Sequence, residues 1–299
     1  MRPMYINVVK FPVKDFHLDH IFDCGQCFRW NRNEDGSWSG IAGGRVARMS
    51  MEPVSSETEG ILQIESSGDC MEESGQFWRE YLDLGRDYGK IKESLRQKDP
   101  AMEQVIAAGE GIRILKQDLW ETMVSFIISQ NNNIPRIKGC IEALAKNFGE
   151  PVFGGQEYFH IPQPEVLAAL TREDLSACRL GYRGPYLIET ARQVLEMGGM
   201  GALEEKLALR KAEAGPEAVS EVLQGFSGVG PKVAACIALF GVQSFGAFPI
   251  DVWMRRVMNQ VYGIGEKNIK EMEEHARKYF AGYEGFAQQY LFYYVRGLQ

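Results

Sequence analysis

Residues 226–232 of the chain read Phe226-Ser227-Gly228-Val229-Gly230-Pro231-Lys232, and this short stretch decides the fold. It separates two apolar patterns with helical spacing, at about 217–224 and 233–240. Glycine adopts positive φ without a steric penalty, and proline is favoured in the first turn of a helix. The pattern therefore predicts a helix–hairpin–helix motif over about 217–240. Backbone N–H groups at the start of the second helix would suit a phosphate, although a plain helix connector explains the same glycines.

A carboxylate follows this hairpin in the segment Pro249-Ile250-Asp251-Val252. Proline restricts the residue before it to extended geometry, so the chain turns before the next helix. Aspartate is a common N-cap, and capping alone would account for Asp251. Placed together, Lys232 and Asp251 would instead supply an amine nucleophile and a negative charge beside a sugar. The residues themselves leave both interpretations open.

Several separate motifs carry a family resemblance. The segments Gly228–Ala234 and Pro249–Val252 resemble the helix-hairpin-helix signature of base-excision DNA glycosylases, and in particular that of the 8-oxoguanine DNA glycosylase family. Four further segments resemble the same family in the same order: Gly25-Gln26-Cys27-Phe28-Arg29-Trp30, Gln130-Asn131-Asn132-Asn133-Ile134-Pro135-Arg136, Leu180-Gly181-Tyr182-Arg183 and Gln288-Gln289-Tyr290-Leu291-Phe292. Motifs that follow the family's order over nearly the whole chain indicate this family far more specifically than any single motif.

The resemblance implies a bifunctional glycosylase and lyase that acts on 8-oxoguanine in double-stranded DNA. Such enzymes flip the damaged nucleotide out of the duplex, because a stacked base cannot be reached. Lys232 would attack the sugar, expel the base and form a Schiff base, from which β-elimination nicks the strand. Asp251 would stabilise the positive charge that develops on the sugar.

The resemblance also assigns a pocket for the damaged base. 8-Oxoguanine carries N7–H where guanine has a bare acceptor, so the carbonyl of Gly25 would distinguish the two. Cys236 and Phe292 would hold the base between them, and Gln288 would bond its Watson–Crick edge. The spacing of Gln288 and Phe292 places both on one helix face. Taken alone, however, Gly25 is explained by a turn, and Cys236 and Phe292 by core packing.

The opposite strand and the DNA backbone have their own residues in this resemblance. The side chains that would receive the orphaned cytosine are Asn131, Arg136, Tyr182 and Arg183, which predicts a preference for cytosine opposite the lesion. The backbone contacts would come from Gly228, Gly230, Val233 and Trp253. Trp253 departs from the animal members, which carry histidine there. Its indole N–H can donate to a phosphate but cannot become cationic.

The expected fold class is α+β, with an N-terminal antiparallel β-sheet domain with helices followed by a two-part all-α glycosylase body. Apolar stretches at 26–31, 38–41 and 60–65, with a turn at Gly43-Gly44, predict strands. Apolar periodicity predicts helices at 119–127, 137–148, 164–178 and 185–198, and a surface helix or loop at 198–216.

The predicted domain boundaries follow from this change of pattern. Residues 1–98 form a TBP-like β domain, and residues 99–299 form the helical body. Within the body, 112–215 is one subdomain, while 99–111 and 216–299 together form the other, which contains the hairpin.

Composition limits the classes of protein and partner. The net charge of −7 argues against a general nucleic-acid coat protein, but not against a DNA enzyme with a local basic surface. No apolar run approaches the roughly 18 residues of a membrane span, and residues 1–14 lack the apolar core of a signal peptide. We therefore expect a protein without a membrane partner, located inside the cell: cytoplasmic or in the nucleoid of a prokaryote, nuclear in a eukaryote. The family resemblance implies a monomer.

Six cysteines fit a reduced intracellular protein. Cys24 and Cys27 form a C-x-x-C pair, but no second pair or histidine cluster completes a zinc site. No cysteine follows Cys236, so we expect no cofactor and, in particular, not the iron–sulfur cluster of a related branch. A structural cation held by the hairpin carbonyls of Gln224, Phe226 and Val229 is a separate expectation.

Three other functions fit parts of the sequence. A glycosylase for alkylated bases would use the aspartate alone and leave Lys232 unexplained. A non-enzymatic helix-hairpin-helix DNA-binding protein would need the hairpin but neither Lys232 nor Asp251. A thiol oxidoreductase would use Cys24 and Cys27.

Overall fold

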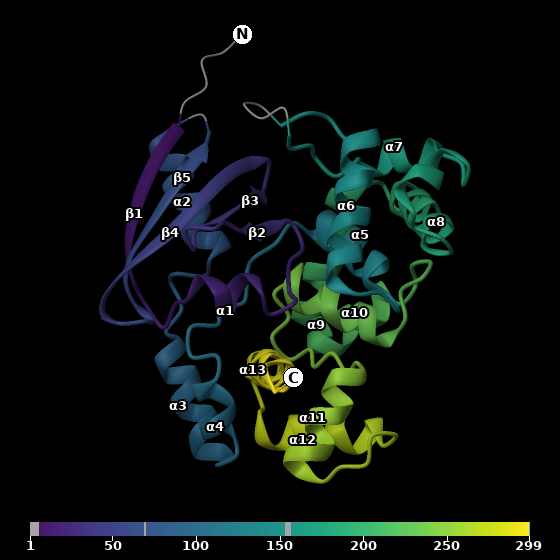
Figure 1. Cartoon of the computed structure of the whole chain (residues 1–299). Coiled ribbons are helices and arrows are strands. Elements are labelled where there is room, and N and C mark those ends of the chain that lie inside the picture. The colour runs from purple at the N-terminus through teal and green to yellow at the C-terminus, as the bar shows by residue number, and fades with distance from the viewer. Residues whose placement is uncertain (1–5, 69, 153–156, 299) are drawn as a thin grey trace.

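A five-stranded antiparallel β-sheet forms the N-terminal part of the chain in the computed structural model, which describes residues 6–68, 70–152 and 157–298 (Figure 1). The strands lie in the order β1-β5-β4-β3-β2. They are β1 (Ile6–Lys14), β2 (Trp30–Arg32), β3 (Trp38–Ala42), β4 (Arg45–Ser56) and β5 (Glu59–Ser67). Gly43 and Gly44 both have positive φ and connect β3 to β4, which confirms the predicted hairpin.

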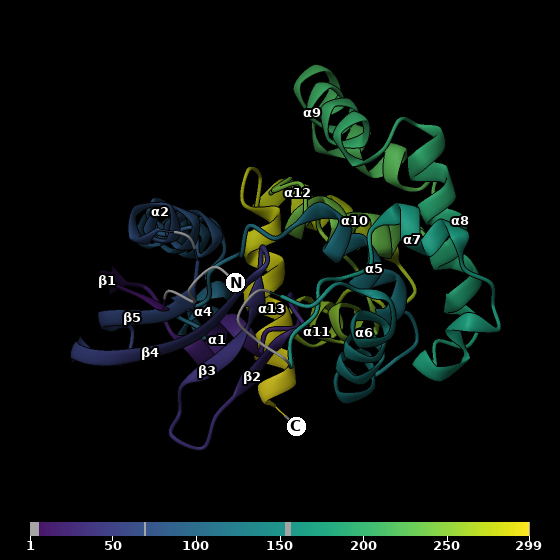
Figure 2. The same ribbon diagram turned by 90° about the horizontal axis from the view of Figure 1, so that it is seen from above.

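The sheet buries one face against α2 (Met71–Tyr81), which crosses it in Figure 2. Leu62 and Ile64 alternate along β5 and are fully buried, as expected when one face of a strand meets a core. Trp78 of α2 is also fully buried, and its Nε1 donates to Ser66 Oγ at 2.9 Å. The sheet therefore has a hydrophobic core of its own.

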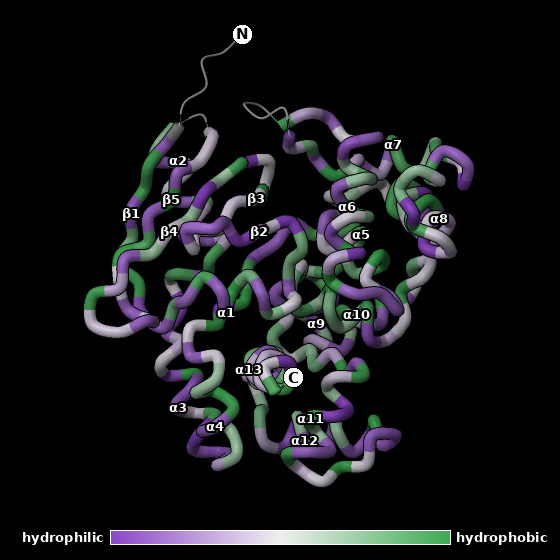
Figure 3. The backbone as a smooth tube through the Cα atoms, in the orientation of Figure 1, coloured by the Kyte–Doolittle hydropathy of each residue, from purple (hydrophilic) through white to green (hydrophobic). Residues whose placement is uncertain are grey.

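Helices enclose a second core in the rest of the described chain (Figure 1). They are α3 (Tyr88–Lys98), α4 (Met102–Ala107), α5 (Leu119–Ser129), α6 (Ile134–Phe148), α7 (Pro164–Ala169), the 3-10 helix η1 (Asp174–Cys178), α8 (Arg183–Glu196), α9 (Met200–Leu223), α10 (Pro231–Phe240), α11 (Val252–Tyr262), α12 (Ile269–Tyr279) and α13 (Glu284–Gly297). The short helix α1 (Leu18–Phe22) packs instead into the core of the sheet. The apolar helices α5 and α10 pack at its centre. The mostly hydrophilic α12 lies at its edge, as Figure 3 shows. The predicted α+β class is confirmed.

The change from one core to the other falls early in the chain. Leu84 still packs against the core of the sheet. Tyr88, Ile91 and Leu95 of α3 already belong to the helical core. The predicted domain boundary at residue 98 stays a prediction, and α3 packs with the body rather than with the sheet.

Two of the predicted elements differ from the structure. The helix predicted at 164–178 was wrong, because α7 ends at Ala169 and η1 starts only at Asp174. Asp174 Oδ2 accepts hydrogen bonds from the Thr171 backbone N–H and hydroxyl at 2.8 and 2.7 Å, and such side-chain bonds compete with a continuing helix. The strand predicted at 26–31 was also wrong in extent, since β2 begins at Trp30 and a loop precedes it.

The segment 198–216 is helical and forms most of α9, which projects from the body in Figure 2. Its backbone leaves the helical conformation at Gly215, next to Pro216, where φ is 79°. No helix in the described part of the chain combines the length and apolar character that a membrane crossing needs.

Candidate active site

The hairpin between α9 and α10 has the predicted helix–hairpin–helix form. Gly228 has a φ of +73°, and a Cβ there would approach the Tyr186 ring to 2.6 Å. Both conformation and space therefore require glycine at this turn. Gly230 caps α10 with open space around its Cα, and Pro231 is the first helical residue. The start of α10 is consequently open to a ligand.

Two side chains of α8 hold this hairpin in place. Gln193 Oε1 accepts from the Ser227 N–H at 2.8 Å, and its Nε2 donates to the Gly225 carbonyl at 3.2 Å. Thr190 Oγ1 donates to the Ser227 carbonyl at 2.9 Å. No pattern in the sequence indicated these contacts, because both residues lie within an ordinary amphipathic helix. The Phe226 carbonyl accepts from the Val229 N–H at 3.1 Å, and the predicted structural cation stays a prediction.

Lys232 lies half-buried in the first turn of α10. Its Nζ is 5.4 Å from the ring centre of Phe126 on α5, within the range of a cation–π interaction. Phe126 was not predicted as a site residue, since an apolar residue in a buried helix looks like any other core residue. Val233, next to the lysine, is buried, so only its backbone N–H remains to meet a phosphate.

Asp251 caps α11. Its Oδ1 accepts from the Met254 N–H at 2.8 Å, and its side chain is half-buried. Oδ2 has no hydrogen-bond donor within the described ranges of the chain, which leaves it available to a ligand. The capping interpretation is therefore confirmed, and the same geometry fixes a carboxylate beside α10. Trp253 follows in the first turn of α11, half-buried, with the guanidinium of Arg256 5.0 Å from its ring.

Cys236 lies one turn after Lys232 and is buried. Burial raises the pKa of its thiol; the positive charge of Lys232 lowers it and the negative charge of Asp251 raises it further. Both charged groups therefore act on the same sulfur atom. The structure brings together three residues that the sequence placed in one site.

The predicted base pocket joins a loop to α13. Gly25 has a φ of +75°, and a Cβ there would lie 3.0 Å from Phe292 Cε1. The Arg296 guanidinium lies 5.8 Å from the Phe292 ring, and its Nη1 donates to the Asp23 carbonyl at 2.6 Å. Gln288 is buried one turn before Phe292 and accepts from its neighbour Gln289 at 2.8 Å. Gly25 and Phe292 are thus in contact, as the sequence predicted for residues of one pocket.

A second cluster contains the residues predicted to receive the opposite base. Asn131 has a φ of +45° after α5, and its carbonyl accepts from Arg183 Nη2 at 2.9 Å. The Arg183 Nε also donates to the Gln130 carbonyl, at 2.9 Å, and the hydroxyl of Tyr182 reaches the same carbonyl at 3.1 Å. Arg136 is exposed in the first turn of α6. Arg183 is therefore bound to backbone carbonyls, and Arg136 is the arginine that faces solvent.

A cavity of about 740 Å³ opens beside Lys232, between α9, α10, α11 and α12, and Lys232 itself lines it. The lining also includes Arg255 and Arg277 together with four glutamates: Glu217, Glu221, Glu273 and Glu284. None of the predicted base-pocket residues lines it. The glutamates would repel a phosphate backbone, so the acidic part of this cavity does not suit a DNA strand.

The cysteine pair does not form a reactive site. Cys24 and Cys27 are both buried, and burial raises the pKa of each thiol above its ordinary value. A nucleophilic or metal-binding cysteine needs the opposite, a stabilised thiolate. All six cysteines are free, and no cluster of three metal-binding side chains occurs among the described residues. The oxidoreductase interpretation loses its chemical basis.

Two family models together match residues 8–281 of the chain. Residues 8–123 match the family model described as 8-oxoguanine DNA glycosylase, N-terminal domain. Residues 124–281 match that of the HhH-GPD superfamily base excision DNA repair protein. The N-glycosylase/DNA lyase of Saccharomyces cerevisiae is 31% identical over 283 residues, which are 88% of this chain and 73% of the yeast protein.

Solved structures extend the likeness over the whole chain. The MBOgg1 structure in complex with a low affinity DNA ligand has a TM-score of 0.87 and 39% identity, with 99% of each chain covered. The Clostridium acetobutylicum 8-oxoguanine glycosylase/lyase in complex with double-stranded DNA containing cytosine opposite 8-oxoG has a TM-score of 0.84 and 37% identity, with 98% of each chain covered. The 3-methyladenine DNA glycosylase of Archaeoglobus fulgidus, at 20% identity and a TM-score of 0.73, shares the fold.

Proposed function

The chain belongs to the 8-oxoguanine DNA glycosylase family of the HhH-GPD superfamily, and from this premise we propose that Lys232 and Asp251 carry out its chemistry. The protein is an N-glycosylase/DNA lyase of base excision repair that removes 8-oxoguanine opposite cytosine from duplex DNA. The observation that supports the assignment is the placement of two groups: Lys232 lies half-buried in the first turn of α10, and Asp251 is fixed as the cap of α11 through Oδ1. Both charges also act on the pKa of the buried Cys236 thiol. An amine and a fixed carboxylate in one region suit a reaction at a single sugar carbon.

The proposed reaction begins with the neutral amine of Lys232. Its lone pair forms a bond to C1′ of the sugar while the bond from C1′ to N9 of the base breaks, and the base leaves with that electron pair and takes up a proton. As this bond breaks, positive charge develops on the sugar, and the fixed carboxylate of Asp251 stabilises it. Nζ gives one of its protons to the departing base; the C1′–O4′ bond then breaks as O4′ takes up the second proton, which leaves the opened sugar as an imine between Nζ and C1′.

Strand cleavage follows from the same imine. The imine makes the C2′ proton acidic; loss of that proton forms a C2′–C3′ double bond and expels the 3′ phosphate with the electrons of the C3′–O bond. Water then hydrolyses the imine and returns the Lys232 amine. One lysine thereby supports both the glycosylase and the lyase step.

We propose that the loop containing Gly25 and the helix α13 together form the pocket that recognises the damaged base. The contact of Gly25 with Phe292 supports a single pocket, in which the Gly25 carbonyl would accept from N7–H of 8-oxoguanine. Phe292 and Cys236 would hold the two faces of the base, and Gln288 its Watson–Crick edge. The buried position of Gln288 suits this role, because an unmatched base would leave its amide unpaired.

Opposite the lesion, we assign the estranged cytosine to Asn131, Arg136, Tyr182 and Arg183. Exposed Arg136 would donate to cytosine acceptors directly. Arg183 donates to the Gln130 and Asn131 carbonyls and would have to break such hydrogen bonds to donate to the base. Gly228, Gly230 and the N–H of Val233 would hold the DNA backbone at the start of α10, and the Trp253 indole would donate to a neighbouring phosphate. We propose that one chain suffices for this interface and that it works inside the cell, where the substrate DNA is.

The test is borohydride trapping on a duplex that carries one 8-oxoguanine opposite cytosine. Borohydride reduces an imine to a stable amine, so the wild type should give a covalent protein–DNA band. Lys232→Gln should give none, although it should still bind the duplex. A band of wild-type strength from Lys232→Gln would assign the nucleophile to another residue.

Opposite-base selectivity has its own test on the same duplexes. With adenine in place of cytosine, the wild type should react more slowly. Arg136→Gln should reduce this difference between the two duplexes. Equal selectivity in Arg136→Gln and wild type would remove Arg136 from the proposed cytosine contacts.

A further inference from the structure

The loop that carries Gly25 contains no helix or strand, yet it must hold a carbonyl in a fixed direction. The Gly25 carbonyl belongs to the peptide unit that ends at Gln26, so the orientation of Gln26 decides where this oxygen points. Gln26 is 1% exposed. Its side chain points away from the base pocket and bonds to residues of the connector, the segment 110–118 between α4 and α5.

Both polar atoms of the Gln26 side-chain amide are hydrogen-bonded. Nε2 donates to the Ile21 carbonyl at 2.9 Å and to the Arg113 carbonyl at 2.8 Å. Oε1 accepts from the Leu115 N–H at 2.9 Å. The Gln26 backbone carbonyl accepts a fourth bond, from Gln117 Nε2 at 2.7 Å. Only a carboxamide of this length offers two donors and one acceptor in this arrangement.

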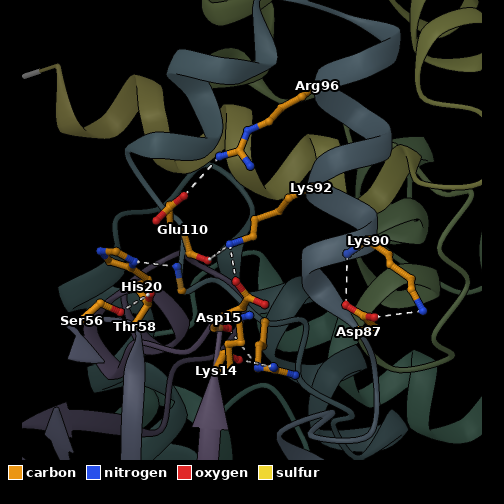
Figure 4. Close-up of polar contacts among 12 residues, drawn as sticks. Lys14, Asp15, His20, Ser56, Thr58, Asp87, Lys90, Lys92, Arg96 and Glu110 are labelled. Carbon is orange, nitrogen blue, oxygen red and sulfur yellow. Dashed lines mark hydrogen bonds and ion pairs between the residues drawn. The ribbon is translucent and has the colours of Figure 1, made fainter. Parts of the chain in front are cut away.

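The connector is itself fixed to both parts of the molecule. On the sheet side, Arg113 Nη2 donates to the Lys14 carbonyl at 2.6 Å. Lys92 Nζ donates to Asp15 Oδ1 at 2.6 Å and to the Glu110 carbonyl at 3.1 Å, as Figure 4 shows. The buried side chains at the start of the connector therefore cannot shift without breaking several bonds.

On the helical side, the connector is bonded to the end of α10. The Gln117 N–H donates to the Phe240 carbonyl at 3.3 Å, and Gln243 Nε2 donates to the Leu115 carbonyl at 3.0 Å. Because α10 also carries Lys232, these bonds form a continuous path from Gly25 through Gln26 to the helix of the nucleophile. The direction of the base-reading carbonyl is thus set relative to the reacting amine.

We propose that Gln26 is a positioning residue that orients the Gly25 carbonyl and thereby sets the selectivity for 8-oxoguanine over guanine. The proposal rests on the proposed function, in which Gly25 reads N7–H. A change of direction at this carbonyl affects a step that needs the base, and it leaves a reaction that needs only the sugar unaffected. Strand cleavage at a preformed abasic site is such a reaction, since it uses the Lys232 imine without a base.

The experiment compares two glutamines that hold two different parts of the site. Gln26→Met removes the amide beneath Gly25 with little change of volume. Gln193→Met removes the matching bonds beneath the DNA-binding hairpin. For each, single-turnover rates are measured on 8-oxoguanine duplex and on abasic-site duplex, together with the ratio of 8-oxoguanine to guanine excision.

Gln26→Met should slow excision of 8-oxoguanine by at least about 10-fold and lower its ratio to guanine, while abasic-site cleavage stays within about 2-fold of the wild type. Gln193→Met should slow both reactions together, because both need the hairpin. Equal loss of both activities in Gln26→Met, or loss of neither, would overturn the proposal. Absence of a borohydride band in the wild type would instead remove the proposed function itself.

A second variant covers the case in which Gln26→Met does not fold. Gln26→Glu has the same length, but its ionised carboxylate would face the carbonyls of Ile21 and Arg113, whereas a protonated carboxyl can donate to one of them. Excision of 8-oxoguanine by Gln26→Glu should therefore rise relative to the wild type as the pH falls, with no such change for abasic-site cleavage. The same pH dependence in both reactions would contradict a positioning role.

Discussion

The nitrogen of the Lys232 ammonium lies 5.4 Å from the centre of the Phe126 ring. The same ring stacks on Phe240 at 5.4 Å and meets the edge of Phe28 at 5.6 Å between ring centres. Phe28 belongs to the motif that begins at Gly25. Phe126 therefore lies between the segment that reads the base and the nucleophile, and the path through Gln26 is not the only link between them.

Phe126→Leu should favour the neutral, nucleophilic form of Lys232. A cation–π contact stabilises the unreactive ammonium by about 0.5–2 kcal/mol, so its loss should speed imine formation at neutral pH by roughly 2- to 30-fold. The measurement is the single-turnover rate of borohydride-trapped complex on an abasic-site duplex. Phe240→Leu is the matched control, because it disturbs the same aromatic stack without touching Lys232, and equal rates in the two variants would assign the effect to core packing.

Asp251 caps α11 and also places a negative charge in the site, and two substitutions separate these effects. Asn caps a helix about as well as Asp, so Asp251→Asn should unfold at nearly the wild-type urea concentration but lose on the order of 100-fold or more in excision rate. Asp251→Ala should lose the same activity and in addition about 1 kcal/mol of stability. Urea unfolding and single-turnover excision are measured on all three proteins. An Asn variant with near wild-type activity would leave Asp251 with capping alone.

Local rules were sufficient for the hairpin and the cap. Gly228, Gly230 and Pro231 each have a conformational preference that acts within a few residues, and Asp251 caps α11 as its position before a helical pattern predicted. The same local rules failed at 164–178, where apolar periodicity concealed the turn between Thr171 and Asp174. Periodicity reports which residues face a core and does not report where a helix is interrupted.

The supports of the site could not be predicted in this way, because their partners are distant in the chain. Gln26 bonds to Arg113 and Leu115, and Phe126 meets Lys232 across the helical core. For Arg183, the family resemblance suggested a base contact, and the structure shows its guanidinium bonded to the Gln130 and Asn131 carbonyls. A resemblance suggests which residues matter, and the structure shows which backbone groups hold them in place.

Gly25→Ala tests the contact between the loop and α13. The left-handed backbone costs an alanine about 1–2 kcal/mol, and its Cβ would press on Phe292 at 3.0 Å. Gly263 has a similar φ of +69° with no atom close to a Cβ, so Gly263→Ala has the backbone cost alone. Both variants should lose stability in urea, Gly25→Ala more because of the Phe292 contact, but only Gly25→Ala should lose excision of 8-oxoguanine. Full excision by Gly25→Ala would separate Gly25 from the base pocket.

Glu121 gives the stability of the fold a specific pH dependence. Burial raises the pKa of its carboxyl to about 7, although the Arg29 guanidinium, 3.7 Å away, opposes the shift, and Asp118 and Glu142 add to it. A raised pKa means that the folded protein keeps a proton that the unfolded chain releases. The resulting stabilisation is complete below the ordinary glutamate value and is lost as the pH rises through about 7. Glu121→Gln should therefore gain more stability over the wild type at pH 8 than at pH 5, measured as the difference in urea midpoints. An equal difference at both pH values would show that Glu121 ionises alike in the folded and unfolded chain.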